Sequence, residues 1–336
     1  MKTIVIRFPL TANDFQKVVR ILQAGGLVAV PTETVYGLAA NALDPKALQK
    51  IFEVKGRPQD NPLIVHVGDR WAVRKLVSEI PESAKLLMKK YWPGPLTIVF
   101  KKSPKIPDSV SAGLPTIAIR MPRHSLIRRL SQAAGFPLAA PSANVSGRPS
   151  STTPEDILED LGGKIDCVID AGGSYYGIES TVIDVSGKIP ILLRPGNISI
   201  EQLRATLGKV RIARGDSLRP KSPGMKYRHY APKAKLIVIE GRKENITKKI
   251  QSMLNRGRGK KIGVLTVQHP RAYRHDCVKF IGATNNLIAR YLFRALREMD
   301  RKGIELILAE GIPEKRSGHA IMNRLRKAAG YNVIKV

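Results

Sequence analysis

Short apolar runs alternate with polar segments through residues 1–214, and their lengths predict many strands and fewer helices. Several runs are separated by only a few residues. Strands therefore outnumber helices, which favours a mixed sheet with helices outside it over a strict alternation of strand and helix. The mostly apolar runs that we predict to be strands are residues 27–30, 63–67, 96–100, 116–121, 137–140, 167–170, 181–185 and 191–193.

Two helix starts can be read directly from this part of the sequence. Thr11 is followed three residues later by Asp14, a capping-box pattern, and the amphipathic run behind them closes at the glycine pair 25–26. Asp44 precedes Pro45, an N-cap residue followed by proline at the first helical position. We therefore predict helices that begin after Thr11 and after Asp44.

Residues 215–233 break the alternation, because they hold three prolines and no apolar period. We predict a linker there, and a linker of this length is commonly functional. Alternation resumes over residues 234–336 with strands at 236–239, 262–267, 304–308 and 333–334 and helices at 244–254, 285–300 and 320–329. The prediction is a domain of residues 1–214, the linker, and a smaller Rossmann-like α/β domain of residues 234–336 with a parallel sheet.

The charge is high and uneven. The 336 residues include 57 Lys and Arg against 27 Asp and Glu, a net charge of +30, while 43% hydrophobic residues suffice for a packed core. Residues 1–214 carry +11, the linker +4 and residues 234–336 +15. Such a balance indicates anionic partners such as a nucleotide or tRNA. A lysine-rich, solvated surface in a heat-adapted protein would give the same composition.

Several common site types are absent from the sequence. The two cysteines, Cys167 and Cys277, form no CxxC or Cys/His cluster, so we predict neither a zinc site nor a disulfide framework. Neither a P-loop nor a dinucleotide fingerprint occurs. The first residues lack a signal peptide's apolar region, and no apolar run approaches the roughly 20 residues that span a bilayer, so we expect a cytoplasmic protein without membrane contact.

Four segments of the first domain combine strand ends with hydroxyl groups and cations. They are residues 31–38 (PTETVYGL), 55–63 (KGRPQDNPL), 116–120 (TIAIR) and 142–150 (SANVSGRPS). Each one taken singly is better explained as a turn or a helix end. Together, Lys55, Arg57 and Asn61 on one loop predict a site for an anionic phosphate. Cations and donors with few bases suit a transition state that gathers charge on phosphate oxygens.

These motifs resemble those of the YrdC family, the L-threonylcarbamoyladenylate synthases. The linker string SPGMKYRHYAP, residues 222–232, is similar to that of the longer, two-domain Sua-type members. The resemblance covers about residues 10–232 and extends more weakly over the second domain. It implies a twisted mixed sheet with flanking helices around a basic cavity.

The resemblance also implies a reaction. Such enzymes condense L-threonine, bicarbonate and ATP, with Mg2+ assisting, to threonylcarbamoyl-AMP and pyrophosphate. A downstream transferase complex then passes the threonylcarbamoyl group to adenosine 37 of tRNAs that read ANN codons. No protein ligands for Mg2+ are evident, and substrate phosphates would supply most of them.

The family's site residues fall on definite positions of this chain. The L-threonine set implied is Thr34, His66, Arg120, the backbone of Ala140, and Ser180. The ATP set implied is Arg57, Asn61, Thr116, Ser142, Ser150, Arg194 and Tyr230, with Tyr230 as a lid on the linker. The catalytic set, facing the phosphates and the carbamate, is Lys55, Arg57, Ser142 and Asn144.

Two other functions compete with this reading. A non-catalytic module that binds double-stranded RNA or tRNA would also use a basic cavity. Carbamoyl-adenylate chemistry in a hydrogenase-maturation protein is disfavoured, because such proteins carry zinc-finger cysteines. The second domain is expected to be either a scaffold for the linker or a docking surface for tRNA or a partner enzyme, with the run 256–261 (RGRGKK) as a candidate phosphate contact.

Overall fold

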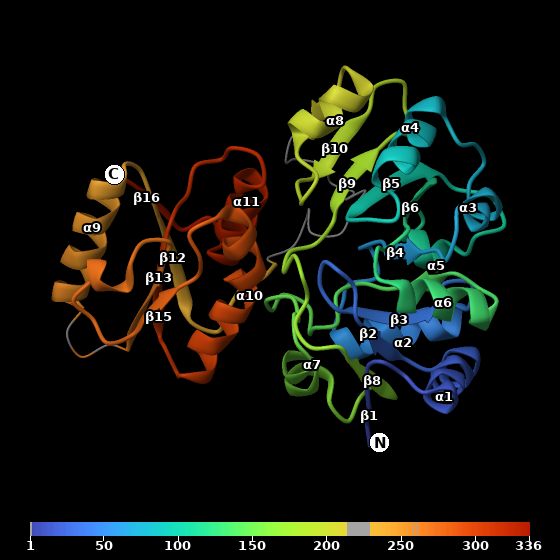
Figure 1. The fold of residues 1–336 in the computed structure, drawn as a ribbon, viewed down its shortest axis with the longest axis horizontal. Helices are drawn as coiled ribbons and strands as arrows, with labels where there is room; N and C mark the ends of the chain where they lie inside the picture. The colour runs from blue at the N-terminus through green and yellow to red at the C-terminus, as the bar shows by residue number, and fades with distance from the viewer. Residues whose placement is uncertain (1, 214–228, 258, 260) are drawn as a thin grey trace. The chain divides into compact units, whose positions relative to one another are not determined.

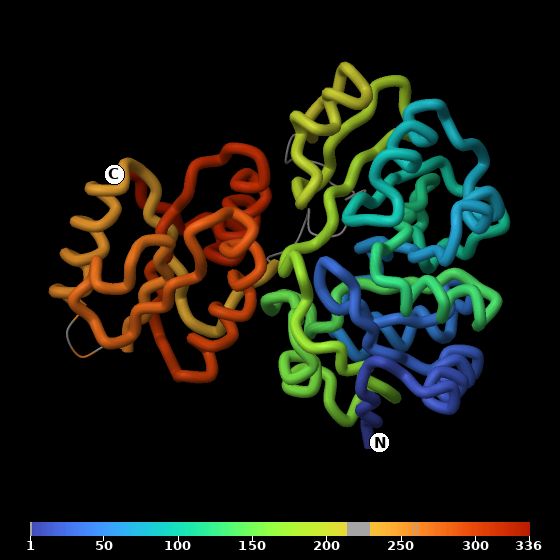
Figure 2. Tube along the Cα trace, viewed as in Figure 1, coloured from blue at the N-terminus to red at the C-terminus, as the bar shows by residue number. Residues whose placement is uncertain are grey.

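The computed structural model describes residues 2–213, 229–257, 259 and 261–336. Its contacts form two compact units, and each is described here by itself (Figures 1 and 2). The first holds the chain up to the linker except Gly147–Pro149 and Tyr176–Ile178, which are grouped with the second. Residues 215–228 of the predicted linker lie outside the described residues, as do Arg214 before it and Arg258 and Lys260 of the candidate phosphate contact.

A mixed sheet of eleven strands organises the first unit. Its order is β1-β8-β2-β3-β7-β4-β6-β5-β9-β10-β11, with parallel and antiparallel neighbours interspersed, which confirms the predicted mixed sheet. The strands are β1 (Ile4–Arg7), β2 (Val28–Val30), β3 (Gly37–Asn41), β4 (Ile64–His66), β5 (Leu96–Lys101), β6 (Thr116–Arg120), β7 (Leu138–Ala139), β8 (Cys167–Asp170), β9 (Thr181–Asp184), β10 (Ile191–Arg194) and β11 (Arg211–Ile212).

Helices flank this sheet, and both predicted helix starts are confirmed. Thr11 caps α1, where its hydroxyl accepts a hydrogen bond from the Asp14 amide, and Asp44 caps α2 ahead of Pro45. The helices of the first unit are α1 (Ala12–Gln23), α2 (Pro45–Lys55), α3 (Trp71–Leu76), α4 (Glu82–Tyr91), α5 (Asp108–Ser111), α6 (Ser125–Ala134), α7 (Pro154–Leu161) and α8 (Ile200–Leu207).

The strands divide their side chains between two faces of the sheet. In β2, Ala29 packs into the larger core, while Val28 and Val30 pack into a second core on the opposite face. That second core lies under α1 and α6, which run side by side (Figure 1). Farther along the same face, over β4, β6, β5 and β9, the buried apolar residues form only a small cluster of Ile64, Val99, Ala118 and Val182. The polar residues of the candidate site adjoin this cluster.

The second unit is a five-stranded parallel sheet of order β14-β13-β15-β12-β16, as predicted for a small α/β domain. Helix α9 lies on one side of the sheet, and α10 and α11 lie on the other (Figure 1). The elements are β12 (Lys235–Glu240), α9 (Lys243–Arg256), β13 (Ile262–Thr266), the 3-10 helix η1 (Pro270–Ala272), β14 (Val278–Phe280), α10 (Asn285–Arg301), β15 (Leu306–Glu310), α11 (Gly318–Ala328) and β16 (Val333–Lys335).

Membrane insertion is not indicated by the helices. None of those in the described part of the chain combines the length and the apolar character needed to cross a bilayer.

Candidate active site

Three adjacent strands of the first unit carry a row of buried polar side chains. The register pairs His66 on β4 with Arg120 on β6, and Arg120 with Thr97 on β5. Residues paired across neighbouring strands point to the same face, so the three side chains lie in a row beside the small apolar cluster. All three are at most 3% exposed. A row of this kind in the interior of a sheet is costly unless its groups have partners or bind a ligand.

Arg120 is held in place by three hydrogen bonds. Its Nη1 donates to the Thr34 hydroxyl at 2.8 Å, its Nη2 to the Glu33 carboxylate at 2.6 Å, and its Nε to the Gly94 carbonyl at 3.1 Å. Burial is the largest single effect and raises the pKa of Glu33, but the Arg120 charge, the hydrogen bond from Arg120 and the backbone hydrogen bonds from Arg123 and Glu33 together lower it. A guanidinium has five N–H groups, so two have no partner among the described residues. These two can still bind a small carboxylate.

His66 is a neutral imidazole in this row. Burial and the neighbouring Arg120 charge hold its pKa well below the usual value. Its Nδ1 is buried and makes no hydrogen bond to any described residue. A neutral ring next to Arg120 can accept or donate one hydrogen bond without adding a second positive charge, which suits a polar ligand at this point.

The neutral state of His66 predicts a specific pH dependence. Below about pH 6.5 the unfolded chain takes up a proton on this histidine and the folded chain does not. The free energy of unfolding should therefore fall as the pH drops below 6.5, with His66 contributing about 1.4 kcal/mol per pH unit until its folded-state pKa is reached. Urea unfolding at several pH values tests this, because His66→Gln should remove that part of the slope. An unchanged slope would mean that the ring is protonated in the folded protein.

Ser180 and Arg194 extend the row on the far side of Thr97. The Ser180 and Thr97 hydroxyls are 2.7 Å apart, and Arg194 donates to the Ser180 carbonyl and hydroxyl, both at 3.1 Å. Arg194 was predicted in the ATP set, whereas in the structure it contacts a residue of the predicted threonine set. The placement brings Thr34, His66, Arg120, Ser180 and Arg194 into one polar neighbourhood.

Gly196 allows the chain to pass close to Ser180. A Cβ at this position would lie 2.3 Å from the Thr181 amide nitrogen and 2.6 Å from the Ser180 carbonyl carbon. Both are backbone atoms of buried residues at the start of β9, so the chain would have to shift. We predict that Gly196→Ala lowers the free energy of unfolding by about 1–3 kcal/mol, the usual cost of overpacking. Urea unfolding measures it, and Gly187→Ala, with no heavy atom within 4 Å of its Cβ, is the matched control.

Lys55 lies at the end of α2 and binds the loop 142–146. The residue is 2% exposed, and its ammonium donates to the carbonyls of Ser142, at 2.5 Å, and Asn144. The Ser146 amide in turn donates to the Lys55 carbonyl at 2.8 Å. Three of the four predicted catalytic residues, Lys55, Ser142 and Asn144, are thus brought together. Lys55 therefore holds this loop in position as well as contributing a positive charge.

Arg57 organises the loop that follows α2. Its guanidinium donates to the carbonyls of Asn61, at 3.1 and 3.2 Å, and Pro62, at 2.9 Å. The Asn61 side chain is 2% exposed, and its Oδ1 makes no hydrogen bond to any described residue. A buried amide oxygen without a protein partner is uncommon and is consistent with a ligand donor at that position.

The other predicted residues lie in different places. Thr116 begins β6 and Arg120 ends it, so about 13 Å of strand separates them. Ser150 is 1% exposed, and its hydroxyl donates to the Glu179 carboxylate at 2.5 Å. Ala140 donates its amide to the Ile64 carbonyl at 3.0 Å.

Tyr230 is a residue of the second unit. Within that unit its ring stacks on Phe293, with centroids 5.1 Å apart, and the Arg324 guanidinium lies 5.4 Å from the same ring. Its backbone has φ +66°, a left-handed conformation that non-glycine residues rarely adopt. The predicted role of Tyr230 as a lid on ATP stays a prediction.

Sequence reasoning missed three residues that contact predicted site residues. Glu33 was quoted in the PTET string but not assigned a role, and it forms the ion pair with Arg120. Thr97 lies inside an apolar strand, where a lone hydroxyl is the signal that marks a polar position on the face opposite the core. Glu179 accepts from Ser150, and nothing in its local sequence indicates that contact.

Comparisons with known proteins decide the family. Residues 20–196 match the family model described as "Telomere recombination", that of Sua5, YciO and YrdC proteins, and residues 198–330 match "Threonylcarbamoyl-AMP synthase, C-terminal domain". The Pyrococcus abyssi protein named threonylcarbamoyl-AMP synthase is 50% identical over 321 residues, 94% of each chain. This chain belongs to the threonylcarbamoyl-AMP synthase family. The Bacillus subtilis protein of the same name is 46% identical over 335 residues, 97% of this chain and 96% of its own.

Solved structures agree with this family assignment. The P. abyssi Sua5 structure, described as complexed with L-threonine, has a TM-score of 0.95 at 46% identity and covers 100% of both chains. The Escherichia coli YciO structure has a TM-score of 0.51 at 24% identity and covers 57% of this chain and 94% of its own, which shows the shared fold of the first unit. The two-domain family form inferred from the sequence motifs is therefore confirmed.

Proposed function

We propose that this protein is a threonylcarbamoyl-AMP synthase that condenses L-threonine, bicarbonate and ATP and releases pyrophosphate. The observation that carries the proposal is the buried row with Arg120 fixed between Glu33 and Thr34. It presents two N–H groups that the described residues leave unused, the right number for one carboxylate. Full-length relatives that carry the synthase name support the same reaction.

The proposed chemistry has two steps. The threonine amine takes up bicarbonate and loses water, which gives a carbamate. A carbamate oxygen then attacks the α-phosphorus of ATP, a new P–O bond forms, and the bond to the pyrophosphate leaving group breaks. The nucleophile is already anionic, so the site needs positive charge and hydrogen-bond donors more than it needs a general base.

The chain's own residues have distinct parts in this scheme. Arg120, Thr34 and neutral His66 bind and orient threonine. Lys55 and Arg57 place positive charge near the α-phosphate and hold the loops that carry Ser142 and Asn61. Among the described residues no group of three or more His, Cys, Asp or Glu side chains could hold a metal. We therefore infer that Mg2+ arrives on the phosphates of ATP.

The decisive experiment measures pyrophosphate release from ATP by the full-length protein. Release that requires both threonine and bicarbonate is the expected result. Release that needs neither threonine nor bicarbonate would contradict the proposed condensation, because ATP would then be cleaved without it. No release at all, while RNA binds, would favour the competing RNA-binding module. The product is proposed to serve the transferase that modifies adenosine 37 of tRNAs reading ANN codons. A coupled assay with such a transferase and tRNA tests that step separately.

The lid role proposed for Tyr230 gives a further prediction. Tyr230→Ala should raise the KM for ATP more than the KM for threonine, because the ring is proposed to cover the nucleotide. Steady-state pyrophosphate release with each substrate varied in turn measures this. Tyr230→Phe, which keeps the ring stacked on Phe293, is the matched control. Equal increases in both constants would contradict a lid on ATP.

A further inference from the structure

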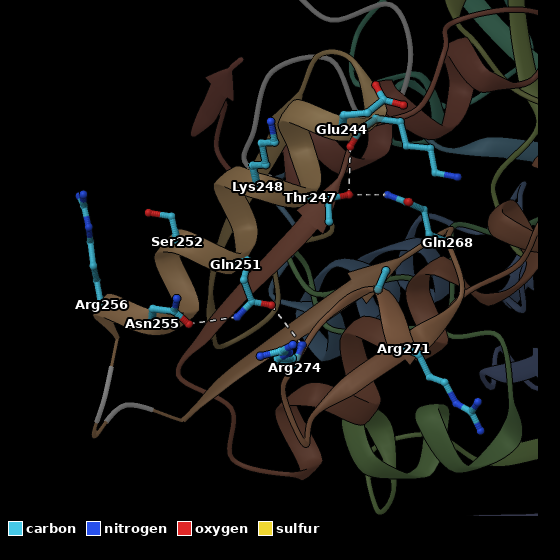
Figure 3. A pocket seen from close by; sticks show the side chains of 12 residues that line it. Glu244, Thr247, Lys248, Gln251, Ser252, Asn255, Arg256, Gln268, Arg271 and Arg274 are labelled. Carbon is cyan, nitrogen blue, oxygen red and sulfur yellow. Dashed lines mark hydrogen bonds between the residues drawn. The ribbon is translucent and has the colours of Figure 1, made fainter.

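A groove on the second unit is lined by cations that the proposed synthase does not use. It has a volume of about 1100 Å3 and lies between α9 and the segment from Gln268 to Arg274 (Figure 3). Its cations come from both walls. They are Lys243, Lys248 and Arg256 from α9, and Arg271 and Arg274 from the opposite segment.

The amphipathic pattern of α9 creates one wall of this groove. Ile246, Ile250 and Leu254 recur every four residues and pack into the core under the helix. The rows beside that apolar stripe are polar, and one of them carries Lys248, Ser252 and Arg256. Eight residues of helix place Lys248 and Arg256 about 12 Å apart along the helix axis. This spacing suits a repeating anion better than a single phosphate group.

Two side-chain amides fix the distance between the walls. The Arg274 amide donates to Gln251 Oε1 at 3.1 Å, and Gln251 Nε2 donates to Asn255 at 3.0 Å. Gln268 Nε2 donates to the Thr247 hydroxyl at 3.2 Å and to Glu310 at 2.8 Å. Figure 3 shows the bonds from Gln251 and Gln268 running between α9 and the opposite segment. These hydrogen bonds hold the two walls of the groove at a fixed separation.

Among the described residues that line the groove, five are cations and one is a carboxylate. All five side chains are exposed, and none forms an ion pair with a described residue. Glu244 is the one carboxylate among the described lining residues. Like charges gathered on two walls repel each other, and a bound polyanion would relieve that repulsion.

We propose that this groove binds the phosphate backbone of a folded RNA. The cations would contact phosphates, while Thr247, Ser252, Gln251 and Asn255 offer hydroxyl and amide groups for sugar hydroxyls. None of the described lining residues is aromatic, so the groove lacks the stacking platforms that bind single-stranded bases. The proposal goes beyond the synthase activity and does not depend on it.

The test uses the full-length protein and a labelled tRNA transcript. Binding is measured by fluorescence anisotropy over a range of salt concentrations, without threonine, bicarbonate or ATP, so the result stands whatever the synthase assay gives. The groove variant combines Lys248→Gln, Arg256→Gln, Arg271→Gln and Arg274→Gln. We expect it to bind at least about tenfold more weakly, and its slope of log K against log salt to be smaller by about 3–4.

A charge-matched control makes the result specific to the groove. Lys235→Gln, Lys302→Gln, Lys315→Gln and Lys335→Gln remove the same charge at exposed positions outside the groove. This control should change the affinity by less than about threefold, and circular dichroism checks that both variants fold. Equal weakening of both, or tRNA binding unchanged in the groove variant, would overturn the proposal. So would groove-dependent binding of phosphatidylserine-containing vesicles or of an acidic protein in the absence of tRNA binding.

Discussion

Arg120→Ala is expected to weaken L-threonine binding by at least about 100-fold and to destabilise the protein by about 3–5 kcal/mol. The two effects have different origins. Threonine would lose the proposed partner of its carboxylate. The fold would retain Glu33 as a buried carboxylate, 7% exposed, without the cation that lowers its pKa. Isothermal titration calorimetry with threonine and urea unfolding measure the two effects independently.

A double variant separates binding from folding. In the double variant Glu33→Gln and Arg120→Ala, the Glu33 charge that Arg120→Ala leaves without a partner is removed. Much of the lost stability should be recovered, because an uncompensated buried charge destabilises the fold more than the loss of the ion pair itself. Threonine affinity should not be recovered. ATP affinity should change far less than threonine affinity in both variants. Intact threonine binding in Arg120→Ala would exclude Arg120 from the threonine site.

Lys55→Met should reduce kcat/KM for pyrophosphate release by at least about 100-fold, which corresponds to about 2.7 kcal/mol of transition-state stabilisation. Methionine fills a similar volume but offers neither the charge nor the hydrogen bonds that the ammonium donates to the Ser142 and Asn144 carbonyls. Each carbonyl left buried without a donor costs about 1–3 kcal/mol. Initial rates with saturating threonine and bicarbonate measure the loss.

The matched control for Lys55→Met lies on the same helix. Lys46→Met makes the same chemical change at an exposed position of α2, so activity and stability should stay close to those of the unchanged protein. If Lys55→Met were as active as Lys46→Met, Lys55 would have neither the charge role nor the positioning role proposed for it.

Most of the predicted strands are apolar runs that the structure contains, but β1, with the equally apolar sequence IVIR, was not predicted. β4, β5, β6, β8, β9 and β10 each lie within about two residues of a predicted run. β3 is not among the predicted strands, because GLAAN consists of residues with low strand propensity and is held in the sheet by its neighbours β2 and β7. β14 was not predicted because its sequence VKF has a lysine between its two apolar residues and so contains no apolar run. Tertiary pairing, rather than local preference, makes these two segments strands.

The candidate site was predictable only in part, because register decides it. The motifs identified Thr34, His66 and Arg120, which the structure places together. They could not indicate that Arg194 contacts Ser180, since this depends on how β9 and β10 pair. They also gave no role to Glu33, whose partner lies 87 positions away in the sequence. A local motif gives the residue type, but the distance between two motifs is set by the sheet.

β6 has a consequence for how this protein could change its choice of amino acid. Arg120 and Thr116 stand at opposite ends of one short strand bonded to β4 on one side and β5 on the other, so no hinge can alter their separation. The strand therefore fixes the distance between Thr116 and Arg120. Ala118 lies between the two ends on the same face, is 4% exposed and packs with Ile64, Val99 and Val182, so a bulkier residue there would change the surface between Thr116 and Arg120.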